Sequence, residues 1–299
     1  MKLRNLGEDR LLNLLLAGLS LGKAVAVGPG DDCALVAIHD RRKLLVLKVD
    51  CVVEGVHFLR GTSASDVGWK AMMRPLSDFA ATSALPQFAL ITVIVPEQTK
   101  VAWIKELYRG LRRAARRFDV SIVGGETSST PGEIAISTSV IGFVEKHRAV
   151  SRRGGKPGDD LFVTGRLGGA LRQKHLQFIP RIVESRWLTE NFSIHAMMDL
   201  SDGLGADLPR LARASKVGFK LDTENLPLTG GAKINDAISE GEDYELLFAI
   251  SPRNRDRLER EWKKRFPRLP LTRIGSLSQL SIKDNQVLPR GYVHFQQSG

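Results

Sequence analysis

Acidic residues in this 299-residue chain gather in short turns, often containing glycine, that follow apolar segments. Six such turns occur: Gly28-Pro-Gly-Asp-Asp32, Val49-Asp50, Ser77-Asp78, Gly124-Gly-Glu-Thr127, Asp199-Leu-Ser-Asp-Gly203 and Gly241-Glu-Asp-Tyr-Glu245. Any one of them is an ordinary cap or turn, because Asp, Ser and Gly are the usual residues at such places. Their repetition at the ends of apolar strands favours a shared role, although composition does not show that they converge in space.

Carboxylates that are brought together in a folded chain repel one another, so a cluster of them needs cations. Mg²⁺ takes oxygen ligands and is commonly held by a few carboxylates together with substrate phosphates. Phosphoryl transfer uses this arrangement, because the metal ion neutralises charge on the transferred group and holds the reacting oxygens in line. Glycine beside a carboxylate also lets backbone N–H groups approach phosphate oxygens. The turns therefore favour magnesium-dependent phosphate chemistry.

Strand and helix patterns alternate along the chain. Strand patterns cover residues 34–38, 44–49, 88–95, 121–123 and 134–144, and helical patterns cover 66–84, with Ser65 as the expected cap, and 100–118. Turn formers and charged residues are then concentrated in the segment 151–158. Beyond it we expect strands at 160–164 and 245–250, a tight loop at 165–170 and a helix at 202–215. The sequence predicts two α/β domains, 1–150 and 151–299.

The formal net charge of +11 raises the question of nucleic-acid binding. Much of the excess lies in two helix-like runs, Leu111–Arg117 and Arg253–Arg268, and such runs are usually solvated helix faces. No zinc-finger spacing or aromatic RNP-type motif accompanies the charge, so we do not expect specific nucleic-acid binding. A basic surface instead attracts anionic substrates such as nucleotides and phosphate esters.

The amino-terminal segment imitates a signal peptide, because basic residues precede the apolar run Leu11–Leu21. Glu8 and Asp9 interrupt the basic-then-apolar order, however, and the leucines of the run follow helical spacing. We therefore expect an amphipathic helix. No apolar run approaches the ~20 residues of a membrane span, and we expect a cytoplasmic protein without a membrane partner.

Other catalytic chemistries lack their usual residues. Cys33 and Cys51 are too few for a disulfide framework and have no metal-type spacing, so we expect both to be small buried apolar residues. Ser201 does not lie in a Gly-x-Ser-x-Gly elbow, and the six histidines form no His-x-x-x-His pair. The Gly165–Gly169 loop is not a P-loop, so a nucleotide enzyme of this sequence would bind phosphates in another way.

Taken in order, the acidic turns belong to a longer series of motifs. The series comprises Leu6-Gly-Glu8, Gly30-Asp-Asp-Cys-Ala-Leu-Val36, Asp50-Cys-Val-Val-Glu-Gly-Val-His-Phe58, Gly68-Trp-Lys-Ala71, Leu76-Ser-Asp-Phe-Ala-Ala81, Gly124-Gly-Glu-Thr127, Arg152 to Asp159, Asp199-Leu-Ser-Asp-Gly-Leu204, Gly241-Glu-Asp-Tyr-Glu-Leu-Leu247 and Gly291-Tyr-Val-His-Phe295. It resembles the signature of thiamine-monophosphate kinases, within the superfamily that includes aminoimidazole ribonucleotide synthetase and selenophosphate synthetase. The resemblance spans nearly the whole chain.

This resemblance implies an α/β fold of the α+β type with two domains. The amino-terminal domain would hold a mixed sheet with helices, bind ATP and Mg²⁺ and form a homodimer, and the carboxy-terminal domain would be α/β. The activity implied is transfer of the ATP γ-phosphoryl group onto thiamine monophosphate, which gives thiamine diphosphate. Several magnesium ions would assist, and positioning and charge neutralisation would carry the rate without a protein nucleophile.

Site residues follow from the matched motifs. The implied metal ligands are Asp32, Asp50, Asp78, Glu126, Asp199 and Asp202, of which Asp199 and Asp202 are also the expected catalytic pair. Positions near the ATP phosphates are matched by Gly125, Arg152 and Ser201. Positions on the side that receives the thiamine compound are matched by His57, Glu242 and Tyr292. For His57 a hydrogen-bonded structural role stays open, and for Tyr292 a role as a core aromatic residue.

The chain departs from the family pattern at several of these motifs. Lys48-Val49 replaces the usual Ser/Thr-Thr pair, which removes two hydroxyl oxygens and introduces a lysine that competes with Mg²⁺ for the carboxylates. Pro75 replaces asparagine, Thr82-Ser83 replaces Met-Gly, and Glu126 replaces aspartate. Two alternatives therefore stay open. One is a same-fold ATP enzyme with another small phosphate or amide substrate, and the other is a catalytically inactive nucleotide-binding regulatory protein.

Overall fold

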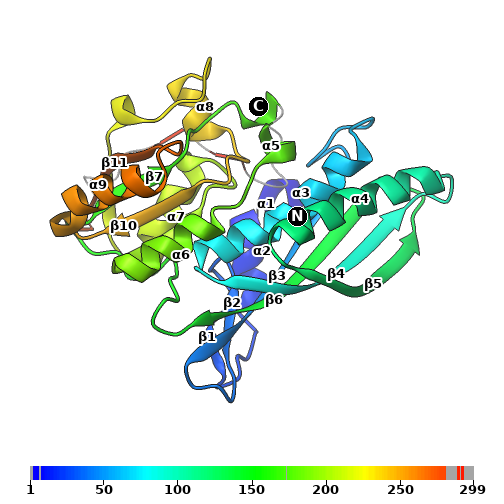
Figure 1. Cartoon of the computed structure of the whole chain (residues 1–299), viewed down its shortest axis with the longest axis horizontal. Coiled ribbons are helices and arrows are strands. Elements are labelled where there is room, and N and C mark those ends of the chain that lie inside the picture. Colours follow the sequence, from blue (N-terminus) through cyan, green and yellow to red (C-terminus); the bar gives the residue numbers. More distant parts are fainter. Residues whose placement is uncertain (1–2, 7, 173, 281–287, 290, 293–299) are drawn as a thin grey trace.

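The computed structural model describes residues 3–6, 8–172, 174–280, 288–289 and 291–292, and two sheets organise them (Figure 1). The first sheet has the order β1-β2-β3-β6-β4-β5. Its strands are β1 (Val25–Val27), β2 (Ala34–Ala37), β3 (Lys43–Val53), β4 (Leu85–Val95), β5 (Ser121–Ser129) and β6 (Ala135–Glu145). Neighbouring strands are antiparallel except for the parallel pair β4–β5.

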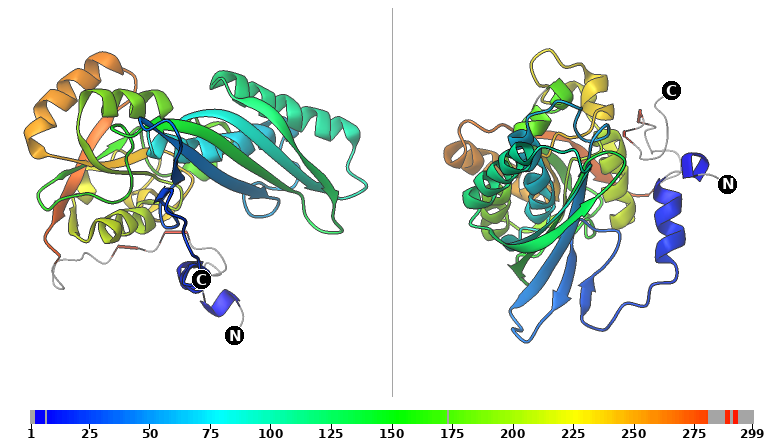
Figure 2. Two further views of the ribbon diagram at one scale, coloured as in Figure 1. Left: turned by 90° about the horizontal axis from the view of Figure 1, so that it is seen from below. Right: turned by 90° about the vertical axis from the view of Figure 1, so that its right-hand side faces the viewer.

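Helices α3 (Ala64–Ala81) and α4 (Val101–Arg117) cover one face of this sheet (Figures 1 and 2). Alternate residues of β3 and β6, such as Val46 and Val140, are buried beneath them. The two helices pack closely, because a Cβ atom at Gly68 of α3 would lie 2.1 Å from the carbonyl oxygen of Leu107. The face of the sheet opposite to these helices is open.

The second sheet has the order β8-β10-β7-β11-β9 and is antiparallel throughout. Its strands are β7 (Asp160–Thr164), β8 (Ile194–Asp199), β9 (Gly218–Leu221), β10 (Leu246–Ile250) and β11 (Leu271–Ser278). The helices of this half are α5 (Lys174–Gln177), α6 (Ile182–Asn191), α7 (Leu204–Ser215), α8 (Ile234–Ser239) and α9 (Arg255–Arg265), with short 3₁₀ turns at Ala170–Arg172, Thr223–Asn225 and Pro252–Asn254.

Both faces of the second sheet are covered, since every residue of β7 and β10 is buried. Phe162 and Phe248 lie in one core with Trp262 of α9 and with the residues beneath α3. Val163, on the opposite face of β7, lies in a second core with Leu208 of α7. Because alternate residues of each strand enter different cores, the central strands lack the polar-apolar alternation of a half-exposed strand.

The two halves contact each other through polar groups as well as the shared core. The Trp69 indole N–H of α3 donates to the Phe178 carbonyl at 3.1 Å. The Arg186 guanidinium of α6 binds both oxygens of Glu145 on β6, at 2.7 and 3.0 Å. The edge of the first half that bears α3 is therefore fixed against α6.

Most predicted elements are confirmed, with ends that shift by a few residues. The predicted strand at 121–123 extends to Ser129, and the predicted helix at 66–84 runs from 64 to 81. The prediction that Ser65 caps this helix is wrong, because the helix begins at Ala64 and the residue that precedes it is Ser63. Cys33 is buried as expected, but the prediction for Cys51 is wrong: this residue of β3 lies on the open face of the sheet.

The amino-terminal helix is confirmed only in part. Helix α1 (Leu3–Leu6) and helix α2 (Glu8–Leu16) lie at the periphery of the molecule (Figure 2), and the predicted run continues beyond α2 without helix. Leu14 and Leu15 are exposed, so the apolar face of α2 is not buried within this chain. No helix among the described residues is long and apolar enough to cross a membrane.

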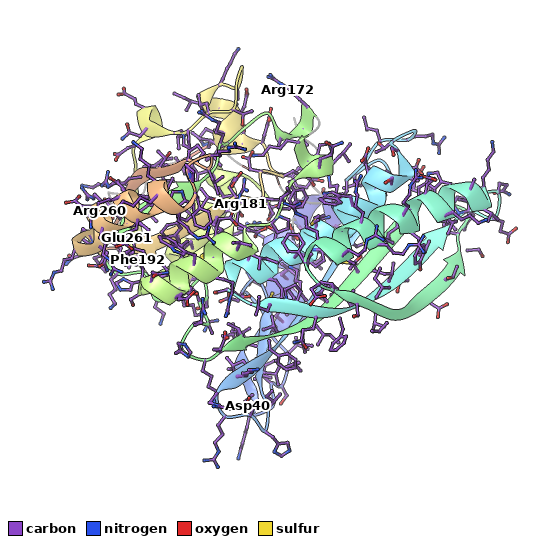
Figure 3. The ribbon with its side chains drawn as sticks, viewed as in Figure 1. Asp40, Arg172, Arg181, Phe192, Arg260 and Glu261 are labelled. Carbon is purple, nitrogen blue, oxygen red and sulfur yellow. The ribbon has the colours of Figure 1, made fainter. Side chains whose placement is uncertain are left out.

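The basic runs are solvated faces, as predicted. On α4 the arginines at 112, 113, 116 and 117 are exposed while Leu111 and Ala114 are buried. Arg260 on α9 is exposed at the outer side of the second half, and Asp40 marks the far tip of the β2–β3 turn (Figure 3).

Candidate active site

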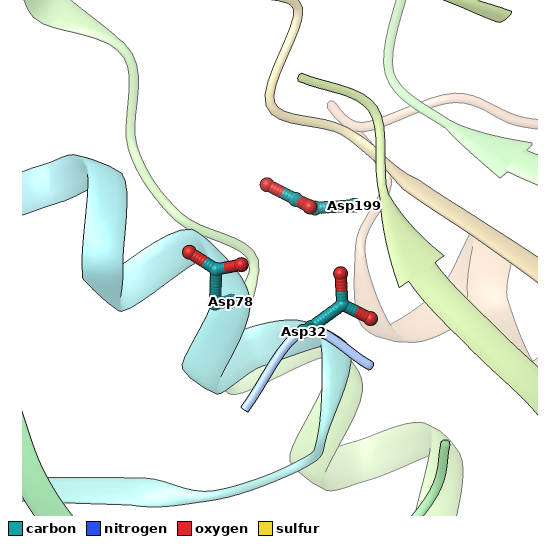
Figure 4. A group of neighbouring side chains, drawn as sticks. All are labelled: Asp32, Asp78 and Asp199. Carbon is teal, nitrogen blue, oxygen red and sulfur yellow. The ribbon is translucent and has the colours of Figure 1, made fainter. Parts of the chain in front are cut away.

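Three aspartates from distant parts of the sequence converge between the two halves (Figure 4). Asp32 lies in the loop before β2, Asp78 in the last turns of α3, and Asp199 at the end of β8. One carboxylate oxygen from each lies within 4.8 Å of the others, and all three residues are buried. Three of the acidic turns that the sequence analysis singled out therefore meet in space.

Asp199 is buried and is hydrogen-bonded to helix α3. Ser77 of α3 donates its hydroxyl hydrogen to Asp199 Oδ2 at 2.6 Å. Burial and the charge of Asp32 raise the pKa of Asp199 to about 7, although the Ser77 hydrogen bond acts in the opposite direction. The carboxylates therefore destabilise one another's ionised forms, and a cation among them relieves that repulsion.

Two protein cations enter the cluster. Arg152 Nη2 lies 2.6 Å from Asp32 Oδ1. Lys48 Nζ, from β3, lies 2.8 Å from Asp78 Oδ1 and 4.0 Å from Asp50 Oδ2. Arg152 thus reaches the place where the resemblance puts the ATP phosphates, and its guanidinium could exchange Asp32 for a phosphate group.

Asp50 lies beside the cluster and has a different environment. Its side chain points from β3 toward α3, where Arg74 Nη2 lies 3.9 Å from Asp50 Oδ1. Lys48 and Arg74 together offset the burial of the carboxyl group and hold its pKa below the ordinary value. The negative charge of Asp50 is therefore balanced by two protein cations, Lys48 and Arg74.

Asp32 Oδ2 is buried and has no hydrogen-bond partner among the described residues. A buried carboxylate oxygen without a donor is costly, so it calls for a cation or water that is bound in the working protein. Oxygens within 4.8 Å need only a small adjustment to share one ion, because oxygens around octahedral Mg²⁺ lie about 3–4 Å apart. The residues present fit a hard divalent cation.

Ser201 and Asp202 form a backbone turn after β8 that Asp207 holds in place. The buried Asp207 Oδ2 accepts the N–H groups of Ser201 at 3.1 Å and Asp202 at 3.0 Å. The Asp202 carboxylate pairs with Arg210 of α7 and is not among the three converging groups. The predicted pair Asp199 and Asp202 is therefore split, one carboxylate within the cluster and the other held by an arginine.

A second polar group lies on the other side of Arg74 and centres on the fully buried Lys70 of α3. Lys70 Nζ donates to the His57 carbonyl oxygen at 2.6 Å, lies 2.7 Å from His175 Nδ1, and pairs with Glu242. Burial lowers the pKa of Lys70 to about 8. Burial opposes ionisation of Glu242 too, but His175 and Lys70 outweigh it and lower that pKa to about 2.

The loop that carries Glu242 has unusual backbone geometry. Glu242 and Tyr244 both adopt positive φ, +70° and +52°, which costs non-glycine residues about 1–3 kcal/mol each. The Glu242 N–H donates to the Ser201 carbonyl, and the Tyr292 N–H donates to the Asp202 carbonyl at 2.9 Å. The predicted substrate residues His57, Glu242 and Tyr292 therefore lie around one region, linked by Lys70 and by the 201–202 turn.

Gly125 and Glu126 lie elsewhere in this chain. The register places Asp50, Thr138, Ile91 and Gly125 in one row across the first sheet, so Gly125 is three strand spacings, about 14 Å, from Asp50. Glu126 lies in the next row, with Cys51, on the open face, and it is exposed. The packing of the sheet itself requires glycine at position 125, since a Cβ atom there would lie 1.8 Å from the Ile91 carbonyl oxygen.

Comparisons with known proteins agree with this geometry. The model of the N-terminal domain of AIR synthase related proteins matches residues 30–144, and that of their C-terminal domain matches residues 152–265. The thiamine-monophosphate kinase of Rhodopirellula baltica is 35% identical, over 90% of this chain and 92% of the relative. That of Aquifex aeolicus is 34% identical over 99% of this chain and 100% of the relative. The chain belongs to the thiamine-monophosphate kinase family.

A solved structure of this kinase family supports the fold in three dimensions. The structure described as AaThiL complexed with AMPPCP and TMP superimposes with a TM-score of 0.83 at 34% identity, over 98% of this chain and 99% of that chain. The predicted family, the two-domain α+β fold and the assignment to the kinase class of enzymes are therefore confirmed.

Sequence reasoning gave no role to several residues that organise the site of this kinase family member. Lys70, Arg74 and Arg210 each form a buried or half-buried ion pair with a predicted site residue, and Asp207 accepts the backbone N–H groups of Ser201 and Asp202. The Gly68-Trp-Lys-Ala71 motif contained one signal, a lysine on the apolar side of a helix. Arg74 and Arg210 had none, because arginines on helices are usually solvated.

Proposed function

We propose that this protein transfers the γ-phosphoryl group of ATP onto the phosphate of thiamine monophosphate, with Mg²⁺ held at Asp32, Asp78 and Asp199. The convergence of these three carboxylates, with Asp32 Oδ2 left without a partner, is the observation that carries the proposal. The names of the relatives and the description of the AMPPCP and TMP complex support the choice of substrates.

Mg²⁺ at these carboxylates would neutralise charge on the phosphate groups of the nucleotide and fix their orientation. The chain's own residues hold the carboxylate oxygens in fixed positions. Ser77 orients Asp199 by its 2.6 Å hydrogen bond, and α3 supplies Asp78 from a rigid element. Arg152, whose Nη2 atom lies 2.6 Å from Asp32 Oδ1, is positioned to bind two oxygens of a phosphate group when one is present.

The Lys70 group would receive the acceptor. Glu242 presents a carboxylate that stays ionised at neutral pH, since its pKa is about 2, and thiamine carries a cationic heterocycle. Tyr292, which is partly exposed, supplies an aromatic ring on the same side of the 201–202 turn. The acceptor phosphate is itself the nucleophile, so no side chain has to form a covalent intermediate.

We also propose a homodimer that forms through the open face of the first sheet. Exposed apolar side chains point outward from β3 and β4, the two strands that flank β6: Leu47, Val49, Phe88 and Leu90. Covering such a face is favourable at about 25 cal/mol per Å² of apolar surface. Gly125 and Glu126, at the β5 edge, would meet nucleotide or metal only in that assembly. The division 1–150 and 151–299, the cytoplasmic location and the absence of specific nucleic-acid binding stay predictions.

The test is to incubate the full chain with ATP and Mg²⁺, with and without thiamine monophosphate, and to quantify ADP and thiamine diphosphate together by chromatography. Equal amounts of both products, formed only when thiamine monophosphate is present, support the proposal. ADP that forms without dependence on thiamine monophosphate would instead identify a same-fold ATP enzyme with another acceptor.

One observation favours a catalytically inactive nucleotide-binding protein as the second candidate. Lys48 already places an ammonium group between Asp50 and Asp78, two of the carboxylates that the family resemblance assigns to Mg²⁺. Nucleotide binding by calorimetry without formation of either product would select this candidate over the kinase.

A further inference from the structure

Lys48 projects from the middle of β3 onto the covered face of the first sheet. Its neighbours Leu47 and Val49 face the open side, so the strand alternation itself directs Lys48 toward α3. Only 22% of the Lys48 side chain is exposed. Lysine is rarely buried to this degree unless its charge is paired.

The carboxylates around Lys48 supply that pairing. Asp78 Oδ1 lies 2.8 Å and Asp50 Oδ2 4.0 Å from Nζ. The Lys48 ammonium group therefore bridges two carboxylates of the site.

At the opposite end of the same cluster the protein cation is Arg152, which binds only the Oδ1 atom of Asp32, at 2.6 Å. Asp32 Oδ2 lacks a hydrogen-bond partner among the described residues, and Asp199 Oδ2 receives only the Ser77 hydroxyl. The carboxylates are thus divided into a pair that is already bridged, Asp50 and Asp78, and an end that is not. Asp78 belongs to both, because its carboxylate also lies within 4.8 Å of Asp32 and Asp199.

We propose that Lys48 permanently occupies the place of one divalent cation, between Asp50 and Asp78, so that this chain binds one ion fewer than a chain with a hydroxyl residue at position 48. Asp50 is then a counterion of Lys48 and Arg74, which lies 3.9 Å away, and it is not a metal ligand. The proposal rests on the metal–nucleotide site described above, but it concerns the number of ions and not the reaction.

The first experiment counts bound Mn²⁺ by electron paramagnetic resonance on the full chain, with and without AMPPCP. We expect the Lys48→Thr variant to bind one more Mn²⁺ per chain than the unaltered protein. Lys43→Thr is the matched control, because it makes the same substitution at the exposed start of the same strand, about 17 Å away. Equal counts in the unaltered protein and in Lys48→Thr would overturn the proposal.

A second variant tests the same idea without removing the lysine. Asp50→Asn should leave the Mn²⁺ count unchanged, whereas Asp199→Asn should lower it by one. Loss of an ion in Asp50→Asn would show that Asp50 is a ligand and would overturn the proposal.

Thermal unfolding separates a substitute for a metal ion from a purely structural lysine. In EDTA the Lys48→Thr variant should melt lower than the unaltered protein by about 5 °C, because two buried carboxylates lose their counterion. Mn²⁺ should restore most of that loss in the variant and not in Lys43→Thr. A loss that Mn²⁺ leaves unrestored would contradict the proposal.

The ion count and the reaction give independent answers. A protein that forms no thiamine diphosphate, but in which Lys48→Thr gains an ion, would end the proposed function and leave the role of Lys48 intact. Normal product formation with equal ion counts would do the reverse.

Discussion

At one end of the site three carboxylates lie within 4.8 Å of one another, and at the other end one carboxylate, Glu242, binds the buried ammonium group of Lys70. Burial acts on both ends, but its result differs. The pKa of Asp199 rises to about 7 because burial and the charge of Asp32 both oppose its ionisation, whereas the pKa of Glu242 falls to about 2 because His175 and Lys70 outweigh burial. The chain completes the charge balance at the Glu242 end and leaves it incomplete at the Asp199 end.

This difference separates two kinds of polar site in the region between the halves. The cluster at Asp199 needs cations from solution, which suits metal-dependent phosphate chemistry. In the group at Lys70 the Glu242 carboxylate already has a protein cation as its partner, which suits recognition of an organic acceptor without a metal ion. The first three predictions alter one end and leave the other intact, and the last alters the contact between the halves that positions both.

The largest effect is expected at the acidic end. Asp199→Asn removes one of the three converging charges, and we expect turnover to fall by about 10³-fold, the loss seen when a preorganised electrostatic contact is removed. Thiamine diphosphate formation measures it. Asp160→Asn is the matched control, because Asp160 is equally buried but lies at the opposite end of the second sheet, paired with Arg255 and Arg273. An equal loss in both variants would mean that instability, not the site, explains the effect.

At the other end, Glu242→Gln keeps the shape of the side chain and removes its charge. We expect KM for thiamine monophosphate to rise about 30-fold with a much smaller change in kcat, since a charge-assisted contact contributes about 1.5–3 kcal/mol. Steady-state kinetics with each substrate varied in turn measures this. A rise in KM for ATP alone would place Glu242 on the nucleotide side and contradict the division of the site.

The acidic end should also depend on pH. Because the pKa of Asp199 is about 7, the carboxyl group must lose a proton before it binds a metal ion, so affinity falls as pH decreases through 7. We expect Mn²⁺ affinity to fall about tenfold between pH 8 and pH 6. Isothermal titration at both pH values measures it, and Asp199→Asn should remove most of the dependence. A pH-independent affinity would be inconsistent with Asp199 as a ligand.

The smallest effect concerns the contact between the halves that positions both ends. The hydrogen bonds from Arg186 hold the pKa of Glu145 at about 2, below its ordinary 4.5. A lowered carboxyl pKa adds stability above about pH 4.5, and this stability is lost as pH falls from 4.5 toward 2. For this partly exposed pair we expect Glu145→Gln to lower the unfolding free energy by about 1 kcal/mol at pH 7. Denaturant unfolding should show the gap to the unaltered protein closing below pH 4.5.

Much of the fold was predictable because strand and helix patterns in the first half are regular. The helix at 101–117 has a buried and an exposed side, and β6 alternates along its whole length. The helix at 64–81 was also predicted, although it is buried along nearly its whole length. Strands such as β8 were not predicted, since a strand covered on both faces lacks alternation. Helix α9 was seen only as a basic run, because its two buried residues, Leu258 and Trp262, are outnumbered by charges.

The site was predictable in its acidic residues and not in their partners. Asp32, Asp78 and Asp199 could be chosen from the motif series, and their convergence needed the tertiary structure. Lys70 was missed because a fully buried lysine depends on Glu242, which lies 172 residues away. The isolation of Glu126 on the open face was equally hidden, because one step of register along β5 decides which face a side chain occupies.

The most direct test of the three-aspartate site is the anomalous difference map from crystals of the unaltered protein grown with Mn²⁺ and AMPPCP. The account predicts a Mn²⁺ peak in contact with carboxylate oxygens of Asp32, Asp78 and Asp199, adjacent to the nucleotide phosphates, and no peak between Asp50 and Asp78. A nucleotide bound with its metal ion away from these three carboxylates would contradict the assignment of the site.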